Sequence, residues 1–402
     1  MTTQTTHRPA ESGNPAVPFD HRLLDSLLEE AGIDVLVATS KHNVQYLLGG
    51  YRFFFFDYKE AIGMSRYLPV LIYPRGRPAD AVYIGNRLES FEKELNRFWT
   101  PTVETKCWGT VDAVELAAKH IARLGSGKAI GIEEGFLPAD AFRALARDLG
   151  RSAFVDAQYP LERLRARKTP HELNLLREAS ERVVDSMLAV FAACRAGQTK
   201  LDLVAMLRQE ETRRGLTFEY CLITGGASHN RAASAQVLRD GDVISLDSGA
   251  NYDNYIGDLC RMGIIGEPDN ELTDILASVD EVQMAARSVL KAGCRGGDVF
   301  VAAEEVIARS PYRDQIDFLA HGMGLVAHEA PQLTPRGPVP YPGRDVERAL
   351  EENMVISIET AIIHPSRGFI KLEDTVAVTA DGWEGFGDAG RGWNRAGTNN
   401  TN

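Results

Sequence analysis

The first half of the chain alternates short apolar runs with segments in which apolar residues recur at helical spacing. Residues 21–32 (HRLLDSLLEEAG) place leucines three and four positions apart before a glycine, which predicts an amphipathic helix ending at Gly32. The other predicted elements of this half are strands over 34–40, 69–74, 80–85 and 129–134 and a helix over 112–125. Because helices and strands alternate, we predict an α/β domain.

From about residue 160 the pattern shifts to longer helices and longer apolar strands. A long amphipathic helix opens at Pro170, and Glu172 stands early in it, where a carboxylate suits the helix dipole. Strand-like runs follow, and the mixture predicts an α+β domain. Both ends of the chain are polar and contain proline or glycine, which is typical of mobile tails. The predicted layout is a flexible tail over 1–18, an α/β domain over 19–160, an α+β domain over 161–386 and a flexible tail over 387–402.

Size and composition indicate an ordinary globular protein. The chain has 402 residues, 44% apolar and 25% charged, and this length favours two domains over one. The net charge of −12 argues against nucleic-acid binding, which usually needs a basic face. Five scattered cysteines argue against a disulfide framework or a cysteine zinc site. The N-terminus lacks an apolar stretch, and no run approaches the roughly 20 apolar residues that span a bilayer, so we expect a cytoplasmic enzyme without membrane contact.

Two aspartates in the second half are candidates for metal binding. Asp247 ends the apolar strand VISL, where a carboxylate is costly unless it is paired or binds a metal. Asp258 follows eleven residues later, an interval that suits a strand, a turn and a return strand. Such a hairpin would bring the two carboxylates side by side. Taken alone, the pair fits two ordinary turn aspartates equally well.

Further along, two histidines and two glutamates strengthen the metal interpretation. HGMGLVAHEAP places His321 and His328 seven residues apart among glycines, and Glu359 and Glu373 each interrupt an apolar strand. Buried carboxylates in three strands would repel one another unless cations lay between them. Carboxylates with one imidazole suit Mn²⁺, Co²⁺, Fe²⁺ or Zn²⁺. Because carboxylates can bridge, five side chains can hold two divalent ions; we favour Mn²⁺. The predicted ligands are Asp247, Asp258, His321, Glu359 and Glu373.

Four runs in this order resemble the pita-bread metallohydrolase family, which includes aminopeptidase P, prolidase and creatinase. The runs are LDSGANYDNYIGDLCR, HGMGLVAHEAP, ISIET and IKLED. The resemblance covers residues 160–385 and implies a pita-bread catalytic domain. The run GIDVLVATSKHNVQYLLGGY is more loosely similar to the smaller α/β N-terminal domain of creatinase-type members. The family also implies a homodimer.

The resemblance implies a role for each ligand. Asp247 and Asp258 match the first two metal carboxylates, with Asp258 bridging, and Glu373 matches the second bridge. His321 matches the imidazole ligand, and Glu359 matches a ligand that also handles protons.

Two further histidines match catalytic positions of the family. His328 matches the histidine that contacts the substrate or the tetrahedral intermediate. His229 matches an upstream histidine that faces the substrate or carries a proton. However, His229 lies eighteen residues before Asp247 where seventeen is expected, and Asn230 occupies the strict position. A loop histidine outside the site is the alternative for His229.

The sequence departs from the family at two positions that bear on the substrate. Thr360 follows Glu359 where proline is usual, and Lys371 stands where aminopeptidase P and prolidase often have arginine. Lysine keeps the charge but loses the bidentate fork of arginine. Creatinases usually lack some metal carboxylates, whereas this chain has all five ligands, so we predict a metal-dependent enzyme.

The leading interpretation is an Xaa-Pro dipeptidase or aminopeptidase P-like enzyme that acts on a small peptide or small amide. The alternatives are a creatinase- or ectoine-hydrolase-like enzyme that cleaves a small C–N bond, and a non-catalytic binding protein on the same fold. The aromatic segment 51–56 around Arg52 predicts either a closed substrate pocket or core packing. The expected substrate-binding residues are Arg52, Phe54 and Tyr255.

Overall fold

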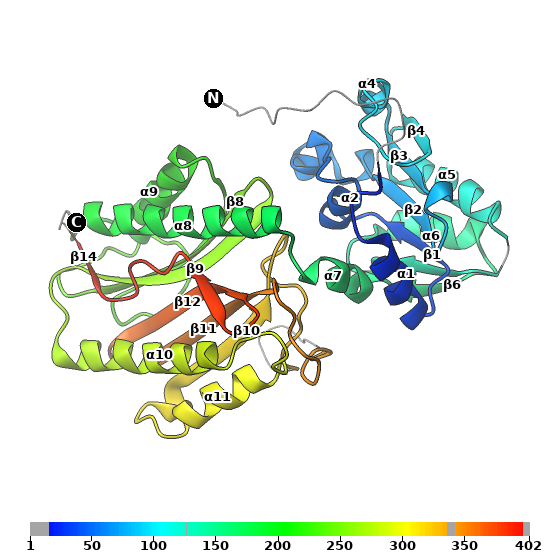
Figure 1. Cartoon of the computed structure of the whole chain (residues 1–402). Coiled ribbons are helices and arrows are strands. Elements are labelled where there is room, and N and C mark those ends of the chain that lie inside the picture. Colours follow the sequence, from blue (N-terminus) through cyan, green and yellow to red (C-terminus); the bar gives the residue numbers. More distant parts are fainter. Residues whose placement is uncertain (1–15, 126, 336–341, 397–402) are drawn as a thin grey trace. The chain divides into compact units, whose positions relative to one another are not determined.

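The computed structural model describes residues 16–125, 127–335 and 342–396 (Figure 1). The chain divides into two compact units, Met1–Arg165 and Ala166–Asn402. Position 160, where we predicted the domain boundary, falls inside helix α7 (Gln158–Ala166). Of the two predicted tails, residues 1–15 and 397–402 lie outside the described residues.

The unit Met1–Arg165 is built on a mixed sheet of six strands in the order β4-β3-β2-β1-β5-β6. The strands are β1 (Val35–Ala38), β2 (Val70–Pro74), β3 (Val82–Asn86), β4 (Thr102–Cys107), β5 (Ala129–Ile132) and β6 (Ala153–Asp156). Its helices are α1 (His21–Glu30), α2 (Lys41–Leu47), α3 (Lys59–Ile62), α4 (Ser90–Glu94), α5 (Thr110–Ala122), α6 (Ala139–Asp148) and most of α7.

Helices cover both faces of this sheet, because every residue of its central strand is apolar. Val35 and Val37 of β1 pack into a core with α5 and α6. Leu36 and Ala38 point the opposite way and pack into a second core with α1, α2 and α7. The predicted α/β domain is therefore a three-layer arrangement.

The unit Ala166–Asn402 is built on an eight-stranded sheet. Six strands follow the order β10-β11-β12-β9-β8-β7, each antiparallel to its neighbours, while β13 pairs with β12 and β14 pairs with β9. The strands are β7 (Thr217–Gly225), β8 (Val243–Tyr252), β9 (Tyr255–Ile264), β10 (Ile316–Gly322), β11 (Val355–His364), β12 (Gly368–Val378), β13 (Trp383–Phe386) and β14 (Asn394–Arg395). The helices are α8 (Pro170–Ala193), α9 (Lys200–Arg213), α10 (Asn270–Ser288) and α11 (Asp298–Ile307).

Two long helices, α8 and α10, cover one face of this sheet (Figure 1). Leu246 of β8 and Leu259 of β9 are buried in a core with α8, and Ile370 and Leu372 of β12 are buried in a core with α10. Because neighbouring residues of a strand point to opposite faces, Asp247, Asp258 and Glu373 must face away from both helices. We call their side of the sheet the metal face.

The C-terminal segment 387–396 is not a flexible tail, so this prediction was wrong. Its strand β14 pairs with β9, and the Asn394 side-chain amide donates to the carbonyl oxygens of Met262 and Gly390 at 2.9 Å each. Arg391 forms ion pairs with Asp374 and Asp280. The polar side chains of this segment form hydrogen bonds and ion pairs with partners in other elements, which a hydropathy pattern cannot show.

Candidate metal centre

The first row of the metal face carries three of the predicted ligands. Asp247 of β8 pairs with Cys260 of β9, and Cys260 pairs with Glu373 of β12. Glu373 pairs in turn with Glu359 of β11. Directly paired residues of antiparallel strands point to the same face, so the three carboxylates share it.

The second row lies two residues along the strands and carries the other two ligands. Asp258 of β9 pairs with Gly249 of β8, and His321 of β10 pairs with Ser357 of β11. Since Gly249 follows Asp247 by two residues, and Ser357 precedes Glu359 by two, both rows face the same way. All five predicted ligands therefore lie on the metal face.

The hairpin between β8 and β9 sets the register of the two aspartates. Asp253 and Asn254 connect the strands with positive φ angles of 49° and 76°, and Tyr252 pairs with Tyr255. A two-residue turn with positive φ at both positions matches the right-handed twist of a hairpin and favours asparagine and aspartate. The predicted strand, turn and return strand are present.

Two glycines let the loop after β10 bring His328 back over His321. A Cβ atom on Gly322 would lie 2.3 Å from the backbone of Ala330, and one on Gly324 would lie 2.4 Å from the Glu329 carboxylate. The backbone N–H of Glu329 donates to the Gly322 carbonyl at 2.9 Å. The two imidazole rings consequently stack, with centroids 3.8 Å apart and planes 19° apart.

The donor atoms fit a site for divalent cations. They form three overlapping groups, each with ligand atoms within 4.8 Å of one another: Asp247, Asp258 and Glu373; His321, Glu359 and Glu373; Asp258, His321 and His328. His321 Nδ1 lies 3.2 Å from the Gly322 carbonyl oxygen. The buried Nε2 has no hydrogen-bond partner among the described residues and lies 3.6 Å from Glu359 Oε1. An imidazole fixed through one nitrogen, with the other directed at carboxylates, is the usual arrangement of a metal ligand.

Burial and neighbouring negative charges raise the pKa of two of the ligand carboxylates. Burial, together with the charges of Glu373 and Asp247, holds the pKa of Asp258 well above its ordinary value. Burial raises the pKa of Glu373 to about 7, although Lys371 opposes the shift. Glu359 differs, because Lys371 and His321 hold its pKa below the ordinary value against the effect of burial. A divalent cation would stabilise the ionised forms of Asp258 and Glu373.

A lysine lies among the ligands. The ammonium of Lys371 is 2.7 Å from Asp247 Oδ2, 2.5 Å from Glu359 Oε2 and 2.8 Å from Glu373 Oε2. Burial alone would lower the pKa of Lys371, but these three carboxylates hold it well above its ordinary value. The sequence showed that Lys371 carries a positive charge where aminopeptidase P and prolidase often have arginine. It did not show that the ammonium contacts three predicted ligands at once.

Several residues of the site have no signal in the sequence. Arg231 contacts Asp247, and Ser357 donates to Glu373 Oε1 at 2.9 Å. Burial is the main cause that raises the pKa of Tyr220, and the negative charge of Asp258 adds to it; the Tyr220 hydroxyl is hydrogen-bonded to Asp258. Each reaches the site through strand register or loop shape, which residue type alone does not reveal.

Two residues predicted at the site make other contacts. His229 is exposed, and its Nε2 lies 3.0 Å from the carbonyl oxygen of His364. It is not among the grouped ligand atoms, so the loop-histidine alternative is favoured. Tyr255 is buried and donates to Glu172 Oε1 at 2.7 Å. That contact favours a structural role over the predicted substrate-binding role.

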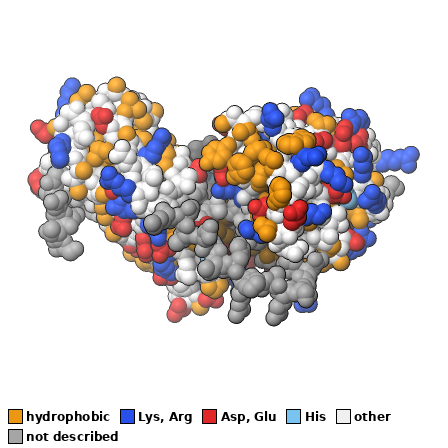
Figure 2. Space-filling model, turned by 90° about the horizontal axis from the view of Figure 1, so that it is seen from above, with side chains coloured by type: hydrophobic (Ala, Val, Ile, Leu, Met, Phe, Trp, Pro, Cys, Tyr) orange, Lys and Arg blue, Asp and Glu red, His pale blue; other side chains and the backbone are white. Residues whose placement is uncertain are grey.

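In the unit Met1–Arg165, the aromatic segment is only partly core. Phe53 is 8% exposed, but Phe54 is 53% exposed, and Tyr58 and Met64 are also exposed. Hydrophobic side chains gather on the face of the molecule seen in Figure 2. Arg52 is paired with Asp57 at 3.1 Å. Core packing therefore accounts for Phe53, while the exposed ring of Phe54 packs against Phe53 and Phe55, with centroids 4.7 and 4.8 Å away.

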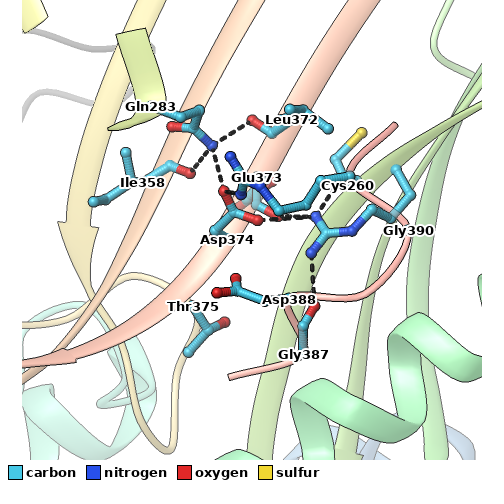
Figure 3. Close-up of polar contacts among 12 residues, drawn as sticks. Cys260, Gln283, Ile358, Leu372, Glu373, Asp374, Thr375, Gly387, Asp388 and Gly390 are labelled. Atoms are coloured by element: carbon cyan, nitrogen blue, oxygen red, sulfur yellow. Dashed lines mark hydrogen bonds and ion pairs between the residues drawn. The ribbon is translucent and has the colours of Figure 1, made fainter. Parts of the chain in front are cut away.

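Behind the metal face, a buried polar network fixes the strands that carry the ligands (Figure 3). Arg261 Nη1 donates to the carbonyl oxygens of Cys260 and Glu373, both at 2.8 Å, and lies 3.0 Å from Asp374. The Gln283 amide donates to Asp374 at 2.9 Å and to two strand carbonyls. The network holds β9 against β12 at the Cys260–Glu373 pair.

Comparison with known proteins agrees with this geometry. A model of metallopeptidase family M24 matches residues 174–380, and a model of the creatinase/prolidase N-terminal domain matches residues 21–167. The first match spans more than half of the chain. The chain belongs to metallopeptidase family M24. It is therefore a metallohydrolase, with a pita-bread catalytic domain preceded by a creatinase-type domain, as the sequence predicted, and M24 proteins generally bind divalent metals.

Similar proteins include several peptidases. The chain is 29% identical over 226 residues to an Xaa-Pro dipeptidase of Pyrococcus furiosus, covering 54% of this chain and 62% of that protein. It is 27% identical over 359 residues to the probable dipeptidase PepE of Mycobacterium tuberculosis, covering 88% and 89%. An Xaa-Pro dipeptidase structure from Bacillus anthracis has a TM-score of 0.78 at 23% identity, covering 93% of this chain and 98% of that one; this likeness supports the fold alone. Among the described residues, no helix has the length and apolar character needed to cross a membrane.

Proposed function

We propose that this M24 protein is a dinuclear-metal-dependent hydrolase that cleaves the amide bond before proline in dipeptides or short peptides. The observation that carries the proposal is the overlap of the ligand groups. Asp258, Glu373 and His321 each belong to two of the three groups, and of these the two carboxylates are the side chains that can bridge two ions. Relatives named Xaa-Pro dipeptidase support the substrate class.

The residues that would hold two divalent ions are Asp247, Asp258, His321, Glu359 and Glu373. Their donor set suits Mn²⁺ first, and also Co²⁺, Fe²⁺ or Zn²⁺. When bound, such ions lower the pKa of a water molecule and polarise the scissile carbonyl.

The chain's own side chains supply the remaining steps. His328 stacks on His321 and keeps an exposed edge, from which an N–H can donate to the oxygen that gains charge in the transition state. Glu359, whose Oε1 lies 3.6 Å from His321 Nε2, would hold a proton and pass it to the leaving nitrogen. In this proposal His229 is a residue of the loop between β7 and β8 and has no catalytic role.

Two further elements belong to the proposal. Arg52 and Phe54 remain the proposed substrate-binding residues, since Phe54 is 53% exposed. The protein would act as a homodimer, as the family resemblance implies.

A second candidate is cleavage of a small non-peptide C–N bond, as in creatinase or ectoine hydrolase. It is favoured by Lys371, because an ammonium already placed among three ligand carboxylates supplies positive charge without metal.

One screen separates the two candidates. Protein reconstituted with Mn²⁺ is incubated with Ala-Pro, a longer peptide with proline second, creatine and ectoine, each with and without EDTA. Our proposal predicts release of free proline from Ala-Pro, abolished by EDTA. Cleavage of creatine or ectoine alone, resistant to EDTA, would reject it in favour of the second candidate.

A further inference from the structure

One lysine is buried in the segment 167–169, which joins α7 to α8. Arg167 pairs with Met354 in an antiparallel bridge, and the backbone N–H of Lys168 donates to the Asn353 carbonyl at 2.9 Å. Because both partners lie just before β11, the segment is fixed within the unit that carries the metal face. The Lys168 side chain is 1% exposed and starts from this fixed backbone.

The ammonium of Lys168 forms a buried ion pair with Glu329. Its Nζ atom lies 3.2 Å from Glu329 Oε1, and the Glu329 side chain is 0% exposed. The same ammonium donates to the Ala166 carbonyl at 3.1 Å. A buried ion pair adds little net stability, because desolvation offsets its attraction, but leaving one of its charges unpaired is strongly unfavourable. The pair therefore fixes the position of Glu329.

Glu329 closes the loop that carries His328. Its backbone N–H donates to the carbonyl of Gly322 at 2.9 Å, and the N–H of Gly322 donates to the carbonyl of Pro331 at 3.1 Å. Gly322 directly follows the predicted ligand His321. The loop thus begins beside His321 and ends at His328, one residue before the buried carboxylate.

The backbone of this loop packs directly on the ion pair. A Cβ atom on Gly324 would lie 2.4 Å from Glu329 Oε1 and 3.0 Å from Cε of Lys168. The Gly324 carbonyl accepts a hydrogen bond from the backbone N–H of Ile256 on β9 at 3.0 Å. The loop is therefore attached to the sheet through Ile256 and rests on the ion pair.

The position of the His328 ring depends on this support. His328 is exposed, and its ring stacks on that of His321 with centroids 3.8 Å apart. Because His328 and Glu329 are neighbours in the chain, a displaced Glu329 would carry the imidazole with it. A displacement of about 1 Å in a group that acts on the transition state can cost about 10²-fold in rate.

We infer that Lys168 is a positioning residue that holds His328 in place through Glu329. The inference rests on the proposed function and adds to it a residue outside the predicted ligand set. It differs from simple stabilisation of the fold, because the effect of Lys168 on the rate passes through His328 alone.

Kinetics in two backgrounds test the inference. Lys168→Met leaves the buried Glu329 carboxylate unpaired, so the loop should move and kcat for Ala-Pro should fall about 10- to 100-fold. KM and Mn²⁺ content should stay near wild type, since no proposed ligand changes. In a His328→Ala background, Lys168→Met should cause no further loss in kcat. Lys168→Arg, which keeps the charge, should recover part of the rate. Lys291→Met, at an exposed lysine of the same unit, is the matched control.

A double substitution covers the case that Lys168→Met does not fold. Lys168→Met/Glu329→Gln leaves no charge of the pair unpaired but removes the attraction, so it should lose several-fold in kcat with the same dependence on His328. Equal losses with and without His328, or loss of Mn²⁺ together with rate, would overturn the inference in favour of a purely structural pair.

A spectroscopic experiment decides the point without turnover. Histidine ring signals are recorded on ¹³C-labelled protein loaded with Zn²⁺, whose filled d shell does not broaden them. His328→Ala identifies the His328 signal among those of the nine histidines. Because the two rings stack, this signal should shift in Lys168→Met and in the double variant, and keep its position in Lys291→Met. An unchanged signal in the Lys168 variants would contradict the inference. If wild type cleaves no dipeptide, the proposed function fails, while this signal still decides the role of Lys168.

Discussion

Replacing Lys371 by methionine tests the electrostatics of the site without touching a proposed ligand. Lys371 has three carboxylate oxygens between 2.5 and 2.8 Å from its ammonium, and its side chain is 4% exposed. Each such pair corresponds to about 6 kcal/mol of attraction at an effective dielectric constant of about 20. Most of that attraction is offset by the cost of removing the ions from water. Methionine fills a similar volume but leaves the buried carboxylates without their cation.

The expected loss depends on whether metal is present. Breaking a buried ion pair by removing one partner costs about 3–5 kcal/mol. For a unit of this size that corresponds to a fall in Tm of roughly 6–20 °C. With excess Mn²⁺ the ions take over the carboxylates, so the difference should shrink to a few degrees.

Thermal unfolding followed by circular dichroism, in EDTA and in Mn²⁺, gives the answer. Lys371→Arg, which keeps the charge, should stay near wild type in EDTA. An equal loss for Lys371→Met under both conditions would refute the reasoning, because it would mean that Lys371 acts through packing rather than as a stand-in cation.

Two other changes give separable outcomes. Burial raises the pKa of Glu211 to about 8 from an ordinary value of 4.5, although Ser248 donates a hydrogen bond to its carboxylate. Between these pH values the unfolded state therefore binds fewer protons than the folded state. The free energy of unfolding should fall as pH rises from about 4.5 to 8, by up to roughly 4–5 kcal/mol. Glu211→Gln should flatten this dependence in urea unfolding at pH 5 and pH 8, and an unchanged slope would contradict it. His328→Ala should keep its metal, measured by elemental analysis, but lose about 10²-fold in kcat; loss of metal together with rate would instead make His328 a ligand.

The sequence was most informative where side-chain alternation fixes a face. Asp247 ends an apolar strand, and Glu359 and Glu373 each interrupt one; together these irregularities predict a buried site. The β8–β9 hairpin could be predicted because the interval of eleven residues between Asp247 and Asp258 suits a strand, a turn and a return strand. Which strands lie side by side could not: the Cys260–Glu373 pair joins residues more than a hundred positions apart.

What the sequence could not show depends on loop shape and long-range pairing. His229 and Arg231 are two residues apart, and only the course of the loop directs Arg231 to Asp247 and His229 to the His364 carbonyl. The segment around Arg391 was predicted as a tail because it is polar. The sequence could not show that Arg391 pairs with the buried Asp374.

The most direct test of the central claim is metal content per chain after reconstitution with Mn²⁺ and removal of loosely held ions. We predict up to two ions in wild type, measured by elemental analysis. Asp258→Asn and Glu373→Gln, each altering a proposed bridge, should hold clearly fewer while their circular dichroism stays that of the folded protein. A wild-type value consistently near zero, or full occupancy in both variants, would contradict the assignment of these residues as the metal centre.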